Sequence, residues 1–323
     1  MPVASATPQT VRRAAELLRN GGVVAFPTET VYGLGADAFD AQAVARIFEI
    51  KRRPLFDPLI VHVAGEEMLA RVVRDVSARA RMLVERFWPG PLTLVFERSD
   101  AVPLLVTAGL ATVAVRMPAH PVALALLHEA RVPIAAPSAN AFGALSPTRA
   151  DRVARTLGER VDLILDGGPT PLGIESTILR LEPFPALLRP GALPVEEIEA
   201  LIGPVERTVR GEHAPSWPGR LPQHYAPATP LRVIAPENVP ITQRARAGFL
   251  GMSRSPEGYG AVRLLSSAGD LREAAARLFE ALHELDDLGL ERIDAEPVPQ
   301  EGLGLAIADR LQRASRNRTG HCQ

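Results

Sequence analysis

Apolar and polar residues alternate with two different periods along the chain, and together they predict a mixed α/β fold. Apolar side chains recur at helical spacing over residues 8–20, Gly21 and Gly22 interrupt this pattern, and the apolar run 23–26 is typical of a short buried strand. Pro27 ends that strand and begins a polar loop. Further strands are predicted at 59–63, 92–96, 112–116, 134–136, 161–165, 177–181 and 187–189. Helices are predicted from Asp40, as N-cap, to just before Pro54, and at 66–87, 121–130, 149–158 and 195–202.

A change in composition follows these elements. Five prolines between residues 215 and 230 exclude a continuous helix or a central strand, so this segment is predicted to be extended and irregular. Beyond it, we expect strands at 231–234, 248–252 and 262–265, a helix at 270–288, an edge strand at 292–297 and a last helix at 303–314. This order predicts a small Rossmann-like α/β domain. The expected organisation is a first domain over 1–210, a linker over 211–230 and a second domain over 231–323.

Net charge and cysteine content narrow the classes of function. The chain has 36 Lys+Arg against 37 Asp+Glu, so no overall positive field holds nucleic acid and any anion site must be local. Cys322 is the only cysteine, which excludes a disulfide framework and fits a reducing compartment. The sequence has no apolar run of about 18 residues and no charged start followed by an apolar stretch. We therefore expect a soluble, cytoplasmic protein with no membrane partner.

Lys51 is the only lysine in the chain, whereas every other residue of the Lys+Arg set is arginine. It lies at the end of the helix predicted to begin at Asp40, in the run Lys51-Arg52-Arg53-Pro54. An ammonium group is a compact point charge that the planar guanidinium does not imitate, and phosphate sites use the two groups differently. By itself, Lys51 fits either a phosphate site or a solvated helix end.

Polar side chains also follow several predicted strands directly. Residues 28–35 come after the first strand, and Ser138 and Asn140 come after the strand at 134–136. Open α/β sheets bind ligands where strands end, so these segments are candidates. An ordinary strand-to-helix turn explains residues 28–35 equally well, and Ser146 fits a helix cap. Three more strands begin or end with polar groups, namely Arg116, Arg189 and Glu175-Ser176.

Several well-known sites are absent from the sequence. No G-x-x-x-x-G-K-[ST] phosphate loop precedes Lys51, and no G-x-S-x-G elbow is present. The run Gly302-Leu303-Gly304 lacks the remaining glycine and the preceding strand of a dinucleotide fingerprint. The seven histidines show no paired zinc spacing, and no metal ligand is assigned. These patterns argue against a P-loop NTPase, an NAD enzyme and a structural zinc site.

Taken in order, the short motifs of this chain resemble those of the YrdC-like family. They are PTETVYGL at 27–34, K-x-R-P at 51–54, PLIVH at 58–62, WPGPLT at 88–93, PSAN at 137–140, SPT at 146–148, EST at 175–177 and RPG at 189–191. The chain is similar to the two-domain, long-form threonylcarbamoyl-AMP synthases in particular, because HYAP at 224–227, GLG at 302–304 and DRL at 309–311 match that form. The likeness runs from about residue 8 to 315. It implies an α/β fold with a twisted mixed YrdC-like sheet and a smaller C-terminal Rossmann-like domain.

The resemblance also implies a reaction: L-threonine, bicarbonate or CO2, and ATP give threonylcarbamoyl-AMP and pyrophosphate. The product would pass to a tRNA threonylcarbamoyl-transfer machinery, and Mg²⁺ would bind mainly through the ATP phosphates. The implied catalytic residues are Lys51, Arg53, Ser138 and Asn140. The implied threonine contacts are Thr30, His62, Arg116 and Ser176. The implied ATP contacts are Arg53, Asp57, Thr112, Ser138, Ser146, Arg189 and Tyr225.

Two positions depart from the family pattern. Asp57 stands where asparagine is expected, and an acid near phosphates weakens binding unless it faces the adenosine hydroxyls or a metal. Arg220 replaces a methionine in the linker. The linker with Tyr225 is either a strap that closes the site or a passive tether. His62 is a candidate base for the threonine ammonium, or simply a hydrogen-bonding partner of the substrate.

Two other functions remain as alternatives. An RNA-binding module would suit a concave basic surface, but the near-zero net charge and few aromatic residues argue against tight binding unaided. A carbamoyl-adenylate-forming carbamoyltransferase, as in the YrdC domains of maturation enzymes, is disfavoured because the chain lacks acylphosphatase and zinc-type segments.

Overall fold

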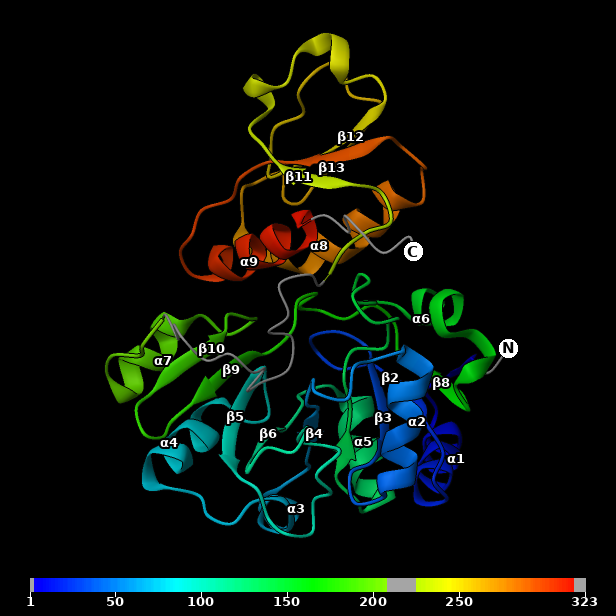
Figure 1. Cartoon of the computed structure of the whole chain (residues 1–323), viewed down its shortest axis with the longest axis vertical. Coiled ribbons are helices and arrows are strands. Elements are labelled where there is room, and N and C mark those ends of the chain that lie inside the picture. The colour runs from blue at the N-terminus through cyan, green and yellow to red at the C-terminus, as the bar shows by residue number, and fades with distance from the viewer. Residues whose placement is uncertain (1–2, 208–224, 317–323) are drawn as a thin grey trace. The chain divides into compact units, whose positions relative to one another are not determined.

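The protein, described by a computed structural model over residues 3–207 and 225–316, forms two compact units, each with its own sheet (Figure 1). Of the described residues, the first unit comprises 3–142, 147–171 and 175–207, and the second comprises 143–146, 172–174 and 225–316. Most of the predicted linker, including Arg220, lies outside the described residues. The second unit also takes in two short segments that we had expected to belong wholly to the first domain.

The first unit is built on a twisted, ten-stranded mixed sheet with the order β1-β8-β2-β3-β7-β4-β6-β5-β9-β10 (Figure 1). Its strands are β1 (Val3–Ser5), β2 (Val24–Phe26), β3 (Gly33–Asp37), β4 (Ile60–His62), β5 (Leu92–Glu97), β6 (Thr112–Arg116), β7 (Ile134–Ala135), β8 (Leu163–Asp166), β9 (Thr177–Arg180) and β10 (Ala186–Arg189). Its helices are α1 (Pro8–Arg19), α2 (Ala41–Lys51), α3 (Glu66–Val72), α4 (Ala78–Phe87), α5 (Pro121–Ala130), α6 (Ala150–Leu157) and α7 (Val195–Ile202). Helix α1 buries its apolar face against α5.

Helix α2 places Lys51 by means of its two ends. Asp40 is the N-cap, and its Oδ1 accepts hydrogen bonds from the amides of Gln42 and Ala43 at 2.8 and 3.1 Å. Arg52 ends the helix in the left-handed conformation, with φ of 53°. The basic run therefore lies at a helix-to-loop junction, as predicted, but the helix ends at Lys51 rather than just before Pro54.

In the first unit the structure corrects the predicted elements in three further places. The single helix predicted at 66–87 is two helices, because Ser77 caps a new helix at the amide of Ala80. Residues 33–37 were predicted as part of a polar loop but form β3, which pairs with β2 on one side and β7 on the other. Strand β1 was not predicted, and it joins the sheet only by pairing with the distant β8.

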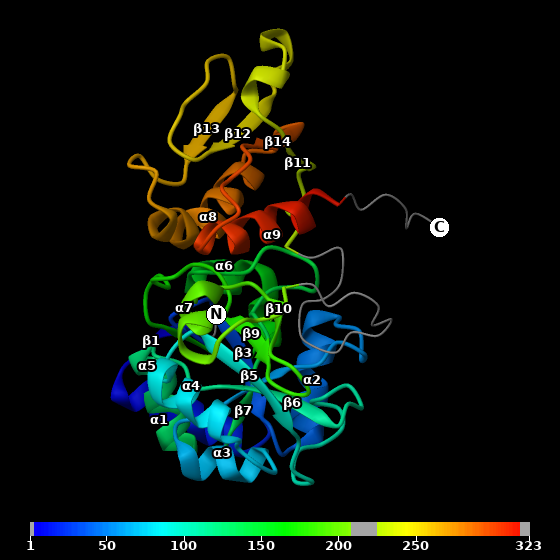
Figure 2. The same ribbon diagram turned by 90° about the vertical axis from the view of Figure 1, so that its left-hand side faces the viewer.

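The second unit has a four-stranded parallel sheet with the order β11-β14-β12-β13. Its elements are β11 (Leu231–Val233), β12 (Ala247–Gly251), β13 (Ala261–Leu264), α8 (Leu271–Asp286), β14 (Arg292–Ala295) and α9 (Leu303–Ser315). Figure 2 shows α8 and α9 side by side on one side of this sheet. The prediction of an edge strand at 292–297 is wrong, because β14 pairs with a strand on each side. No helix within the described parts of either unit is long and apolar enough to cross a bilayer.

Candidate functional site

Two neighbouring strands, β4 and β6, carry two of the candidate site residues on one face of the sheet. His62 of β4 pairs with Arg116 of the parallel strand β6, so both side chains start from the same face of the sheet. Strand β5 pairs Leu94 with Val115, which places Thr93 next in the same row. Thr112 also belongs to this face, but it lies at the exposed start of β6, about 13 Å along the strand from Arg116. The predicted threonine and ATP contacts of β6 therefore lie at opposite ends of one strand.

Arg116 holds the loop that follows β2. Its Nη1 donates to Thr30 Oγ1 at 2.9 Å, and its Nη2 forms an ion pair with Glu29 Oε2 at 3.1 Å. Thr30 Oγ1 is also 2.8 Å from the hydroxyl oxygen of Thr28, and all four side chains are buried. Burial lowers the pKa of Arg116, and the neighbouring Glu29 opposes that shift. An arginine still remains charged near neutral pH, so this buried cluster contains a fixed cation.

Ser176 is held from two sides. Its Oγ is 2.7 Å from Thr93 Oγ1, and Arg189 Nη2 donates to it at 3.1 Å. The same guanidinium donates to the main-chain carbonyl of Ser176 from Nη2 at 2.9 Å and from Nε at 3.1 Å. Gly191 permits this approach, because a Cβ there would lie 2.3 Å from the carbonyl carbon of Ser176 and from the amide nitrogen of Thr177. Arg189, predicted as an ATP contact, thus positions a predicted threonine contact.

His62 is buried, and its ring packs edge-on against Phe26 with 6.0 Å between centroids. Burial and the nearby positive charge of Arg116 lower the pKa of His62 to about 3. The imidazole is therefore neutral near pH 7, and its Nδ1 has no hydrogen-bond partner among the described residues. A weakly basic imidazole favours the hydrogen-bonding interpretation of His62 over the interpretation as general base.

Lys51 is buried at the end of α2 and faces the loop that follows β7. Its Nζ donates to the main-chain carbonyls of Ser138, at 2.5 Å, and Asn140, and it lies 3.5 Å from Asn140 Oδ1. The hydroxyl of Ser138 in turn donates to Asn140 Oδ1 at 2.5 Å. Burial, and then the charge of Arg53, lower the pKa of Lys51 well below its ordinary value. The structure thus brings together three of the four predicted catalytic residues, Lys51, Ser138 and Asn140, around the ammonium group of Lys51.

The fourth, Arg53, organises the next turn. Its Nε and Nη2 donate to the carbonyls of Asp57 and Pro58 at 3.0 and 2.8 Å, and Nη2 is 2.9 Å from Asp57 Oδ2. Both side chains are buried. The negative charge of Asp57 is therefore compensated inside the protein, which removes the conflict expected for an acid close to phosphates.

Ser146 and Tyr225 belong to the second unit. A bridge between Ala144 and Ala226 joins their two segments, and the amide of Ala226 donates to Gly143 O at 2.9 Å. The carbonyl of Ser146 lies 3.3 Å from His283 Nε2.

The aromatic ring of Tyr225 is buried within the same unit. It packs on Phe279 at 5.7 Å, and the guanidinium of Arg310 lies 4.9 Å from its centroid. These two predicted ATP contacts are thus close in the fold, although 79 positions separate 146 from 225 in the sequence.

Two residues of the cluster had no role in the sequence analysis. Glu29 forms the ion pair with Arg116, and Thr93 contacts Ser176. Both lie within motifs that the analysis quoted, and the signal for Glu29 was an acidic residue between two threonines after a buried strand. Their partners are distant in the sequence, so residue type and position alone gave them no function.

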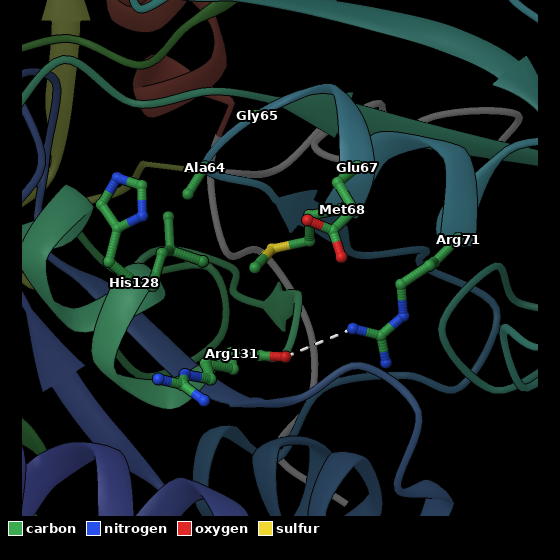
Figure 3. Close-up of a pocket in the computed structure, with 8 residues that line it drawn as sticks. Ala64, Gly65, Glu67, Met68, Arg71, His128 and Arg131 are labelled. Atoms are coloured by element: carbon green, nitrogen blue, oxygen red, sulfur yellow. Dashed lines mark hydrogen bonds between the residues drawn. The ribbon is translucent and has the colours of Figure 1, made fainter.

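One hollow of the first unit is separate from these residues. It has a volume of about 410 Å³ and lies between α3 and α5, lined by Ala64, Gly65, Glu67, Met68, Arg71, Leu127, His128 and Arg131 (Figure 3). Within it, Arg71 Nη1 donates to the carbonyl of Arg131 at 3.2 Å. None of the predicted site residues lines it, so the chemistry of the site and this cavity do not coincide. Among the described residues, no group of three or more His, Cys, Asp and Glu is arranged to hold a metal ion.

Comparison with known proteins agrees with this arrangement over both units. A family model of the Sua5, YciO and YrdC proteins, described as "Telomere recombination", matches residues 16–191. A second, described as "Threonylcarbamoyl-AMP synthase, C-terminal domain", matches residues 193–316.

Individual relatives match along nearly the whole chain. The threonylcarbamoyl-AMP synthase of Pyrococcus abyssi is 44% identical, with 94% of each chain covered, and that of Bacillus subtilis is 45% identical, with 95% of this chain and 93% of the relative covered. A solved structure of P. abyssi Sua5 complexed with L-threonine superposes with a TM-score of 0.89 at 42% identity, covering 97% of this chain and 96% of that chain. The chain therefore belongs to the two-domain Sua5 branch of the Sua5/YciO/YrdC family.

Proposed function

We propose that this protein is a threonylcarbamoyl-AMP synthase, which converts L-threonine, bicarbonate or CO2, and ATP into threonylcarbamoyl-AMP and pyrophosphate. The observation that carries the proposal is similarity to relatives of that name over at least 94% of the chain, combined with two buried polar clusters centred on Arg116 and Lys51. The product supplies the threonylcarbamoyl group for modification of tRNA through a downstream transfer machinery.

Threonine binds at the Arg116 end of the face. A guanidinium grips a carboxylate with two parallel hydrogen bonds, and burial strengthens the interaction. The hydrogen bonds of Thr30 and Ser176 to arginine side chains support a role for both hydroxyls in recognising the substrate hydroxyl. A site that hydrogen-bonds a hydroxyl discriminates strongly against analogues without it, because its own polar groups then stay unpaired.

ATP binds towards Lys51, the loop 138–140 and the exposed end of β6 at Thr112. The carbamate of threonine must approach an α-phosphate that is already negatively charged, and fixed cations lower that barrier. The hydrogen bonds of Lys51 to main-chain carbonyls support a role as a positioned charge that also shapes the loop carrying Ser138 and Asn140. Arg53 lies next to Lys51, and its own charge is paired with that of Asp57.

The chemical step needs no covalent enzyme intermediate. The threonine amine adds to CO2 and loses a proton, which gives the carbamate. A carbamate oxygen then forms a bond to the α-phosphorus, the bond from that phosphorus to the oxygen bridging it to the β-phosphate breaks, and pyrophosphate leaves with the electron pair. The residues act by position and charge. Mg²⁺ is expected to neutralise the phosphates, with most ligands from ATP and water, because such sites seldom need a full protein cage. Tyr225 and the linker before it are expected to help close the nucleotide site, which remains a prediction.

The decisive assay measures pyrophosphate released from ATP, with threonine and bicarbonate omitted in turn. The proposal requires that release depend on both. Release driven by carbamoyl phosphate instead would support the carbamoyltransferase alternative, and salt-dependent tRNA binding without threonine-dependent release would support the RNA-binding alternative.

A further inference from the structure

We propose that Glu29 binds the α-ammonium group of the amino-acid substrate, so that Glu29 and Arg116 together form a clamp for both charges of the zwitterion. The clamp rests on the proposed function, because it takes L-threonine as the substrate.

Only one of the two carboxylate oxygens of Glu29 accepts hydrogen bonds from the described residues. Its Oε2 accepts from Arg116 Nη2 at 3.1 Å and from the amide of Ala119 at 3.0 Å. Its Oε1 is buried and has no hydrogen-bond partner among the described residues. A buried acceptor without a donor destabilises the protein. A ligand that donates a hydrogen bond to Oε1 would offset that destabilisation.

The guanidinium of Arg116 likewise has an unused hydrogen-bond donor. Its Nη atoms hold Thr30 and Glu29, whereas its Nε is buried without a hydrogen-bond partner among the described residues. The ion pair therefore offers an unused acceptor, Glu29 Oε1, and an unused donor, Arg116 Nε, on groups that touch each other. An α-amino acid carries its ammonium and carboxylate on one carbon, with the opposite arrangement of charge. The ammonium group of the amino acid can therefore face Glu29 while its carboxylate faces Arg116.

Other nearby acceptors fit the ammonium less well. The hydroxyls of Thr28 and Thr30 already bond to each other, and His120 Nδ1 accepts from the amide of Val122 at 3.2 Å. His62 offers a neutral Nδ1, which lacks the net negative charge that attracts an ammonium group. The fixed negative charge of Glu29 is the stronger acceptor for a cation.

A pair of ligands separates the clamp from a purely structural role of Glu29. We would measure by calorimetry how the full-length protein binds L-threonine and (R)-3-hydroxybutanoate, which is threonine without its amino group. Wild type should bind L-threonine at least about 10-fold more tightly. Glu29→Gln should weaken L-threonine binding about 10- to 100-fold and change (R)-3-hydroxybutanoate binding less than about threefold. Glu67→Gln, which removes an exposed carboxylate of α3, is the matched control and should change neither.

The outcomes distinguish this clamp from the proposed function. Equal affinity of wild type for the two ligands overturns the clamp and does not depend on folding of a variant. Equal weakening of both ligands by Glu29→Gln also overturns it, because loss of Arg116 positioning would act on the shared carboxylate. Failure of wild type to bind L-threonine at all would overturn the proposed function, and the clamp with it.

Discussion

The side-chain nitrogen of Lys51 lies 2.5 Å from the main-chain carbonyl oxygen of Ser138, and this contact joins the end of α2 to the loop after β7. The lysine is buried, and the loss of hydration, followed by the nearby charge of Arg53, lowers its pKa. A planar guanidinium cannot converge on several acceptors in this way. The single lysine of the chain therefore stands at a position that arginine would not fill.

Replacing Lys51 by methionine keeps most of the side-chain volume and removes the charge and its hydrogen bonds. We expect threonine-dependent pyrophosphate release to fall about 100- to 1000-fold, as for loss of one positioned charge-stabilising donor. The control is Arg52→Gly, because Arg52 is exposed and already has the backbone conformation that glycine favours. Release by Lys51→Met within a few fold of wild type would contradict the central role of this ammonium.

Replacing Gly191 by alanine should disturb Ser176 without touching any functional group. The added methyl would lie 2.3 Å from main-chain atoms of Ser176 and Thr177, so the two segments must separate. We expect a loss of about 1–3 kcal/mol in stability and weaker threonine binding, measured by denaturant unfolding and calorimetry. Gly65→Ala is the matched control, since nothing lies within 4 Å of a Cβ at that position. Equal effects of the two substitutions would contradict the steric argument.

Replacing Thr93 by valine removes the hydroxyl that faces Ser176 at nearly constant volume. The Ser176 hydroxyl then loses one of its two partners, and a hydrogen bond of this kind contributes about 1 kcal/mol. We expect KM for L-threonine to rise roughly five- to tenfold and the preference for threonine over serine to decrease. Steady-state kinetics with both amino acids checks this, with the exposed Thr242→Val as control. An unchanged preference for threonine over serine would show that Thr93 does not position Ser176 to recognise the substrate hydroxyl.

The imidazole of His62 should stay neutral far below the ordinary histidine pKa of 6.5, because its pKa is lowered to about 3. Protonation then favours the unfolded state, so the stability contributed by neutral His62 is complete above pH 6.5 and is lost as pH falls towards 3. At pH 5 the loss is about 2 kcal/mol, and His62→Gln should not show it. NMR titration of the imidazole signals, assigned with that variant, provides the measurement. Titration of His62 near pH 6.5 would contradict the prediction.

The sequence by itself determined the elements whose signals are local. Helices α5 and α7 have the predicted bounds, because proline at the start of one and helical apolar spacing in both act within a few residues. Strand β3 escaped prediction, since its glycines are poor strand formers and only distant pairing makes it a strand. Gly35 in that strand is explained only by the fold, where a Cβ would lie 2.5 Å from Ile134 Cγ2.

The same division applies to the site. Composition singled out Lys51, and motif order indicated the family and most of the candidate residues. Only the tertiary structure decided that Lys51 serves main-chain carbonyls, that Asp57 is neutralised by Arg53, and that Glu29 meets Arg116 from 87 positions away. Hydrogen-bond partners and burial depend on which strands become neighbours, and that choice is made by the whole hydrophobic core rather than by any short segment.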